Sequence, residues 1–148
     1  MEKISVMENT AMKNRNIKKI LLVLIVIAAV LIIYSLVKAP TLKGFYQSEL
    51  VDGYTIQLTI DKGEKKFIEY IDNRDVNSGT YTKNEDGSYE FNGKRQDFKI
   101  HLNHDNTFHL TIQKLNGGQP ILLKNISKTP AYFTYDWDDL KKYRALLN

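Results

Sequence analysis

The sequence predicts a mainly β fold: an N-terminal transmembrane helix, an up-and-down antiparallel meander of about eight strands forming a small barrel, and a short C-terminal helix. Three observations support this prediction. Residues 20–37 form an uncharged apolar run, residues 44–126 alternate between apolar and polar side chains with frequent turn residues, and residues 136–147 show helical spacing. The 148 residues suffice for one ordinary domain.

The apolar run at 20–37 consists mostly of Ile, Leu and Val. As a helix rising about 1.5 Å per residue, it reaches roughly 27 Å, close to the ~30 Å hydrocarbon core of a bilayer. A core helix of a soluble protein normally carries a polar stripe, and this run has none. We therefore expect residues 20–37 to anchor the chain in the plasma membrane.

Charges beside this run predict its orientation. Lys13, Arg15, Lys18 and Lys19 precede it, whereas Lys38 follows it almost alone. Positive charge is retained on the cytoplasmic side of a membrane helix. Residues 1–19 are therefore predicted to be a cytoplasmic tail, and the remainder to be extracytoplasmic.

A cleaved signal peptide is the alternative, because the triplet at 37–39 resembles a small-x-small cleavage site. The length of the apolar run and Pro40 directly after it favour an uncleaved, single-pass signal anchor. Residues 38–43 are expected to form a short stalk, and residues 44–148 the extracytoplasmic domain.

Composition excludes several classes of protein. The net charge is +4, but much of the excess lies in the tail, and the domain mixes both signs. A nucleic-acid-binding surface needs a basic stripe on the folded part, so we expect no nucleic-acid partner. The chain has no cysteine, which excludes disulfides and a cysteine-linked lipid anchor.

Strand periodicity is clearest at 54–60, where Tyr54, Ile56, Leu58 and Ile60 fall on one face. Short turn-rich segments separate it from its neighbours, and short loops join antiparallel strands. Closure into a barrel hides the edges that an open sheet would expose. The predicted strands lie within FYQSEL, YTIQLTI, KKFIEYID, GTYTKN, SYEFNG, QDFKIHL, TFHLTI and PILLKNI.

The segment 136–147 places aspartates early and basic residues late, as a helix dipole favours. Trp137, Leu140, Tyr143 or Arg144, and Leu147 follow helical spacing. This C-terminal helix is expected to pack on the barrel.

All histidines lie in HLNHDNTFHL, at His101, His104 and His109. If His104, Asp105 and Asn106 form a three-residue turn with Asn106 left-handed, His101 faces His109 across a hairpin. Zinc takes three or four ligands. The pattern therefore favours a solvated strand face over a metal site, and these histidines are only weak metal candidates.

Glu69 is ambiguous, because apolar residues flank it on both sides; facing inward, it would be a buried acid with a raised pKa and a candidate site. Asp72, Asp75 and Asn77 supply oxygen donors but lack the glycine and glutamate positions of a calcium loop. No nucleophile motif or catalytic constellation stands out. We expect a non-enzymatic protein without a cofactor.

Many tyrosines and phenylalanines lie on the predicted strands. A barrel of about eight strands is either filled by such side chains or holds one small ligand. The shortness of the strands favours a filled core.

This layout, together with the opening GFY at 44–46, resembles small membrane-tethered proteins of low-GC Gram-positive bacteria with lipocalin-like β-meander domains. We expect a membrane-anchored binding or protein-interaction module that acts on an envelope protein or peptide, a class that includes accessory and immunity-type factors. The alternative is a carrier of a small apolar ligand inside the barrel, and a metal-dependent enzyme is third.

Overall fold

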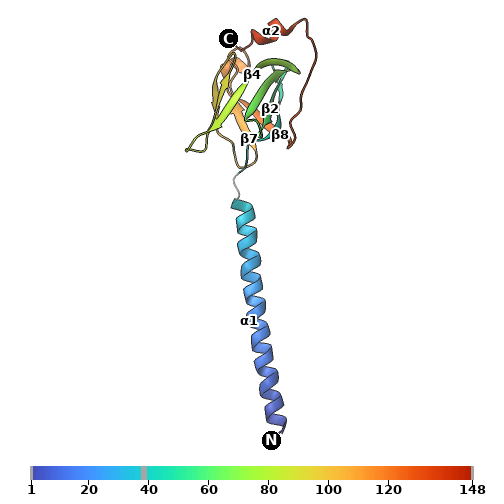
Figure 1. Cartoon of the computed structure of the whole chain (residues 1–148), viewed down its shortest axis with the longest axis vertical. Coiled ribbons are helices and arrows are strands. Elements are labelled where there is room, and N and C mark those ends of the chain that lie inside the picture. Colours follow the sequence, from blue (N-terminus) through green and yellow to red (C-terminus); the bar gives the residue numbers. More distant parts are fainter. Residues whose placement is uncertain (1, 38–39, 148) are drawn as a thin grey trace. The chain divides into compact units, whose positions relative to one another are not determined.

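The computed structural model describes the backbone of residues 2–37 and 40–147 and the side chains of residues 17–34 and 40–147. The chain divides into two compact units, Met1–Ala39 and Pro40–Asn148 (Figure 1). The described part of the first unit is one helix, and the second unit is a β-barrel.

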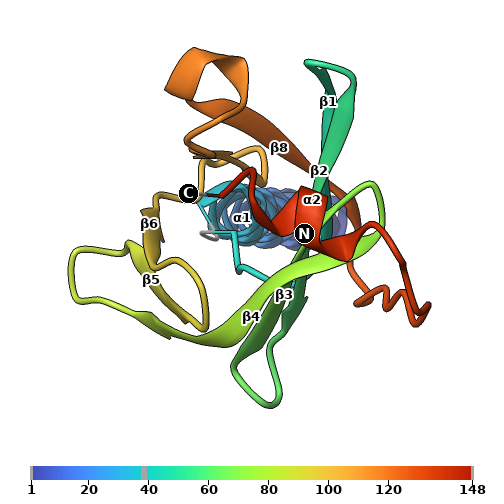
Figure 2. The same ribbon diagram turned by 90° about the horizontal axis from the view of Figure 1, so that it is seen from above.

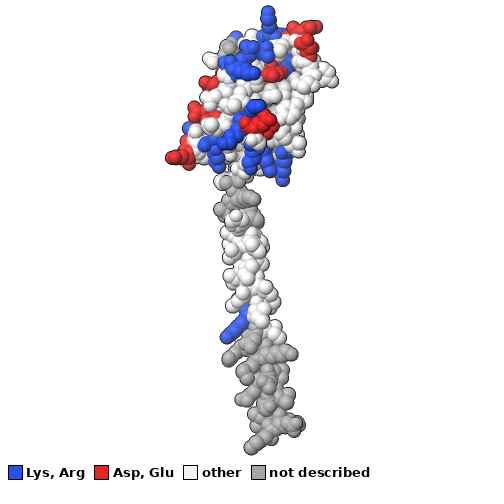
Figure 3. Space-filling model, viewed as in Figure 1, with Lys and Arg blue, Asp and Glu red and all other residues white. Residues whose placement is uncertain are grey.

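Helix α1 spans Glu2–Val37, so the predicted tail at 1–19 is helical from Glu2 onward. Its segment Ile17–Tyr34 is long and apolar enough to cross a membrane, and none of it is buried (Figure 3). The large apolar side chains between Ile20 and Ile33 are at least half exposed. By length and composition, this segment is compatible with a membrane anchor or a signal sequence.

The second unit confirms the predicted antiparallel meander. Its strands follow the order β6-β5-β4-β3-β2-β1-β8-β7, so β8 closes back on β1 and the barrel is nearly complete (Figure 2). The strands are β1 (Gly44–Val51), β2 (Tyr54–Asp61), β3 (Lys66–Ile71), β4 (Arg74–Lys83), β5 (Tyr89–Gly93), β6 (Phe98–Ile100), β7 (Thr107–Leu110) and β8 (Ile121–Ser127).

Side chains fill the barrel interior. Ile60 of β2 lies opposite Phe67 of β3, which places both on the inner face. We call Tyr46, Phe67, Phe91 and Phe108 the aromatic centre; each is at most 1% exposed. The ring centroids of Tyr46 and Phe108 are 4.9 Å apart, and those of Phe67 and Phe91 are 5.0 Å apart. These distances are those of directly packed rings.

The sheet is interrupted between β6 and β7, which stand at opposite ends of the strand order. Near this seam, the Asn103 N–H donates to the Thr107 carbonyl at 2.8 Å. The short helix η1 (Asn116–Gly118) lies in the loop between β7 and β8. Its neighbour Leu115 and the C-terminal Leu147 are both buried in the core.

Residues 128–139 form an extended segment, here called the C-terminal strap, that lies on the outer face of the barrel. Phe133 packs edge-on against Phe45 of β1 and Tyr70 of β3, with centroids 5.8 and 5.1 Å away. The Thr59 hydroxyl of β2 donates to the Ala131 carbonyl. The strap therefore covers part of β1, β2 and β3.

The C-terminal helix α2 spans Leu140–Arg144, which is shorter than the predicted 136–147. Arg74 holds the preceding residues against the barrel: it pairs with Asp139 at 2.9 Å and lies 4.0 Å from the centre of the Trp137 ring. These contacts fix residues 137–139 outside the helix. Sequence periodicity cannot detect such tertiary contacts.

The predicted stalk at 38–43 is also shorter than expected. Residues 38 and 39 lie outside the described residues. Leu42 is 1% exposed and belongs to the barrel core. The folded domain therefore includes residues that precede the first strand.

Candidate functional site

An outer groove of about 550 Å³ crosses the outer face of β2, β3 and β4 beside the strap. Its floor includes Thr59, Ile68, Ser78 and Thr80, which alternate with inward-facing residues such as Phe67. The period of two in a strand explains why hydroxyl groups and one apolar side chain line this surface. The full lining is Thr59, Asp61, Glu64, Lys66, Phe67, Ile68, Ser78, Gly79, Thr80, Lys94 and Tyr132.

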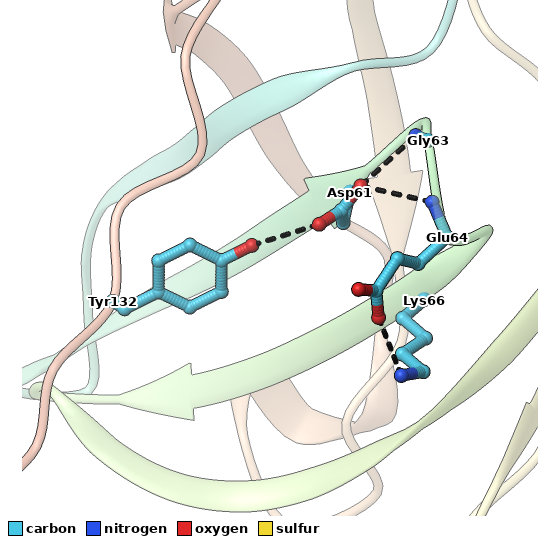
Figure 4. A network of polar contacts seen from close by, with 5 residues as sticks. All are labelled: Asp61, Gly63, Glu64, Lys66 and Tyr132. Carbon is cyan, nitrogen blue, oxygen red and sulfur yellow. Dashed lines mark hydrogen bonds and ion pairs between the residues drawn. The ribbon is translucent and has the colours of Figure 1, made fainter.

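One wall of the groove is a polar network centred on Asp61 (Figure 4). The Tyr132 hydroxyl donates to one oxygen of Asp61 at 3.2 Å, and the N–H groups of Gly63 and Glu64 donate to the other at 2.9 and 3.1 Å. The bond from the Glu64 N–H is the main cause of a lowered Asp61 pKa. Lys66 forms an ion pair with Glu64. The wall joins the strap to the β2–β3 turn.

A second hollow, here called the cationic pocket, has a volume of about 230 Å³. Lys94 and Arg95 follow β5, and Arg144 comes from α2. Asp75 is the acidic residue of the lining, and burial raises its pKa while the three nearby cations oppose that rise. Val76, Asn77 and Ser78 complete the lining. Positive charge therefore exceeds negative charge around this pocket.

Glu69, Asn77 and Gln96 form a third feature, here called the polar corner. Glu69 lies opposite Leu58, on the inner face, and is completely buried. The Asn77 amide donates to it at 3.1 Å, and the Gln96 amide donates to both its oxygens at 3.0 and 3.1 Å. Burial raises the pKa of Glu69 to about 7, and the hydrogen bonds from Asn77 and Gln96 limit that rise. The structure thus places Glu69 inward, which the sequence left open.

A β-bulge and a close approach of two segments of the chain create the polar corner. The β3–β4 register shifts between Glu69 and Tyr70, next to Asn77. A Cβ atom on Gly93 would lie 2.2 Å from the Gln96 carbonyl oxygen, so only glycine fits there. The glycine lets the loop after β5 fold back and bring Gln96 to Glu69.

The three histidines are exposed and lie apart from these features. Asn106 has the predicted left-handed conformation, with φ of 60°. The predicted pairing of Asn103 with Thr107 is present as a backbone hydrogen bond of 2.8 Å, but no ladder joins β6 to β7 and His101 lies beyond the end of β6, so His101 and His109 are not ladder partners as predicted. Within the described residues, no three His, Asp or Glu side chains are grouped to hold a metal ion.

The oxygen donors weighed as calcium ligands have structural partners. One oxygen of Asp72 accepts from the Thr55 N–H at 2.8 Å, and the other accepts from the Tyr143 hydroxyl at 3.2 Å. Asn77 is part of the polar corner. The contacts of Asp72 join the β3–β4 turn to β2 and α2.

Comparison of the chain with protein-family models, curated proteins and solved structures found no match. Its function is therefore argued from its own geometry.

Sequence reasoning singled out Glu69 but missed its partner Gln96 and the cationic pocket. Arg144 reaches Asp75 across 69 sequence positions, and no local pattern indicates that approach. Gly93, directly before Lys94 and Arg95, was the one local signal in the sequence that another part of the chain lies close to the backbone there.

Proposed function

We propose that this protein is a membrane-anchored extracytoplasmic interaction module that binds an extended peptide segment of an envelope protein in its outer groove, without catalysing a reaction. Helix α1 would be the anchor, inserted with its N-terminus in the cytoplasm. The barrel would present the groove outside.

The strap is the observation that carries this proposal. It is an extended segment that already lies on the outer face of the barrel. The Thr59 hydroxyl donates to its backbone, and its own Phe133 packs against Phe45 and Tyr70. Beside the strap, Ser78 and Thr80 offer hydroxyl groups and Ile68 offers an apolar side chain. Hydroxyl groups that bond to main-chain atoms give affinity for any extended peptide, and neighbouring apolar positions give specificity.

The filled interior favours this function over the carrier. Aromatic rings pack across the space that an apolar ligand would occupy. The groove is instead on the outside, where a partner can approach without opening the barrel.

A soluble random hexapeptide library tests the groove. The full chain, held in uncharged maltoside micelles, should retain library members that are then eluted and sequenced. Thr80→Trp should abolish retention by filling the groove, whereas Thr82→Trp, on the same strand but outside the lining, should not. Equal retention by both variants, or none by the wild type, would contradict the proposal.

Labelling of single cysteines tests the anchor, because the natural chain has none. In intact cells, a membrane-impermeant maleimide should modify Thr111→Cys but not Asn14→Cys. The intact mass should include residues 1–39. Modification of Asn14→Cys alone would reverse the orientation, and loss of the first 39 residues would indicate a cleaved signal.

A further inference from the structure

The outer groove and the cationic pocket are adjoining parts of one surface. Ser78 and Lys94 line both hollows. A chain lying in the groove along β4 therefore reaches the three cations of the pocket at one end. The other side of the groove is bounded by Asp61 and by the Glu64–Lys66 ion pair, so this wall has a small excess of negative charge and the surface becomes basic where the pocket begins.

The cations of the pocket are available to a ligand. The ion pairs formed within the described part of the chain use Lys66, Arg74, Lys99 and Lys124. Arg144 donates from Nε to the Asp75 carbonyl oxygen at 3.3 Å, which leaves its terminal nitrogens to other partners. The Asp75 carboxylate offsets only part of the charge of Lys94, Arg95 and Arg144.

The loop that carries two of these cations is held in place by its backbone. The Lys94 N–H donates to the Ser78 carbonyl at 2.9 Å, and the Arg95 N–H donates to the Asn77 side-chain oxygen at 3.0 Å. Asn77 is itself fixed by Glu69 in the polar corner. A preorganised loop pays less conformational entropy when a ligand binds.

We propose that the cationic pocket receives the C-terminal carboxylate of a peptide that lies in the outer groove. This inference rests on the proposed function and names the end of the peptide that is recognised. Arg95 and Arg144 present planar guanidinium groups, which match a carboxylate in two-point geometry, and Lys94 adds a point charge at the junction. A free chain end fits because the pocket adjoins the groove at Ser78 and Lys94.

Peptides with free and amidated C-termini test the carboxylate. Hexapeptides retained from the library are resynthesised in both forms and titrated against the full chain in maltoside micelles. The free acids should bind at least about tenfold more tightly than the amides, because a charge-assisted bond to a guanidinium is lost in the amide. Equal affinities, with Thr80→Trp still blocking both, would overturn this inference and leave the proposed function standing.

A minimal probe tests the pocket without the groove. Acetyl-dialanine with a free carboxylate should shift the ¹⁵Nε signals of Arg95 and Arg144 and leave those of Arg15 and Arg74 unchanged, whereas its amide should shift none. Unmoved signals would overturn the inference. Shifts with this probe, in a chain that retains no hexapeptide, would support the carboxylate site and overturn the peptide-binding function.

Variants and a competing anion complete the test. Arg95→Gln and Arg144→Gln should each remove most of the preference for the free acid, and Arg144→Lys should restore part of it. Lys142→Gln removes the same charge from α2 outside the pocket lining and should change the preference less than about twofold. Inorganic phosphate that competes more strongly than acetate would assign the pocket to a phosphate-bearing ligand and overturn the inference.

Discussion

The barrel interior contains two regions of opposite chemistry that share one strand. Phe67 of β3 points into the aromatic centre, and Glu69, two residues further along the same face, points into the polar corner. Both side chains are at most 1% exposed. Rings stabilise the first region by removing apolar surface from water, whereas hydrogen bonds in the second only compensate for burying a carboxylate.

The contrast shows that equal burial does not mean an equal contribution to stability. The aromatic centre is expected to supply much of the folding free energy. The polar corner is expected to cost stability while it fixes the loop that carries Lys94 and Arg95. Four substitutions or conditions test this difference, taken from the largest expected effect to the smallest.

Phe67→Ala should lower the free energy of unfolding by about 3–5 kcal/mol, because it removes a buried ring and leaves a cavity beside Phe91. Urea unfolding of the full chain in micelles, followed by circular dichroism and by fluorescence of the single tryptophan, measures the loss. A loss below about 1 kcal/mol would show that the aromatic centre is loosely packed.

Stability should fall as pH rises through neutrality. Burial raises the pKa of Glu69 from its usual 4.5 to about 7, so the folded protein holds this proton more tightly than the unfolded chain. The resulting stabilisation is complete below about pH 4.5 and is lost as the pH passes 7, a change of about 3 kcal/mol.

Unfolding curves for the wild type and Glu69→Gln between pH 4.5 and 8 measure this dependence. The glutamine does not titrate, so its curve should be flatter over that range. An identical slope in both proteins would mean that Glu69 does not control the dependence of stability on pH.

Asn77→Ala should cost about 1–3 kcal/mol, since it takes one hydrogen bond each from Glu69, the Arg95 N–H and the Gln96 carbonyl. It should also raise the pKa of Glu69 further, because the lost bond favoured the ionised form. The pH at which stability is lost should therefore move upward. A downward shift would contradict the assignment of Asn77 as a donor.

Lys99→Gln should change stability least of the four. Lys99 pairs with Asp86 at 3.1 Å, but both side chains are about half exposed. Water and salt already solvate such charges, so the pair contributes little. Melting temperature at low and high salt is the measurement. An effect as large as that of Asn77→Ala would show that an exposed polar contact contributes as much to stability as a buried one.

The sequence was sufficient for the strands because a half-buried strand shows its inner face as a period of two. Ile56, Leu58 and Ile60 show this pattern without ambiguity, and short turns fixed the meander order. Glu69 broke the pattern, because apolar neighbours lie on both faces of β3: Tyr70 is outward yet covered by Phe133 of the strap. The cover comes from a distant segment that periodicity cannot detect.

The candidate site was less predictable for the same reason. Arg144 and the Lys94–Arg95 pair belong to separate elements, and only the folded chain brings them around Asp75. The histidines were conspicuous because all three lie within residues 101–109. In the structure His101 lies beyond the end of β6, and β6 is not paired with β7, which carries His109.

The pairing of β1 with β8 has a consequence for how the protein is made. Lys124 of β8 and Glu49 of β1 form an ion pair although they are 75 positions apart in the chain. During synthesis, the second edge of β1 therefore has no partner until nearly the whole domain has emerged. An unpaired strand edge can template pairing with another chain, and long-range strand pairing is slow. The interval between synthesis of residues 44–51 and 121–127 is the period in which misassembly is most accessible to this protein.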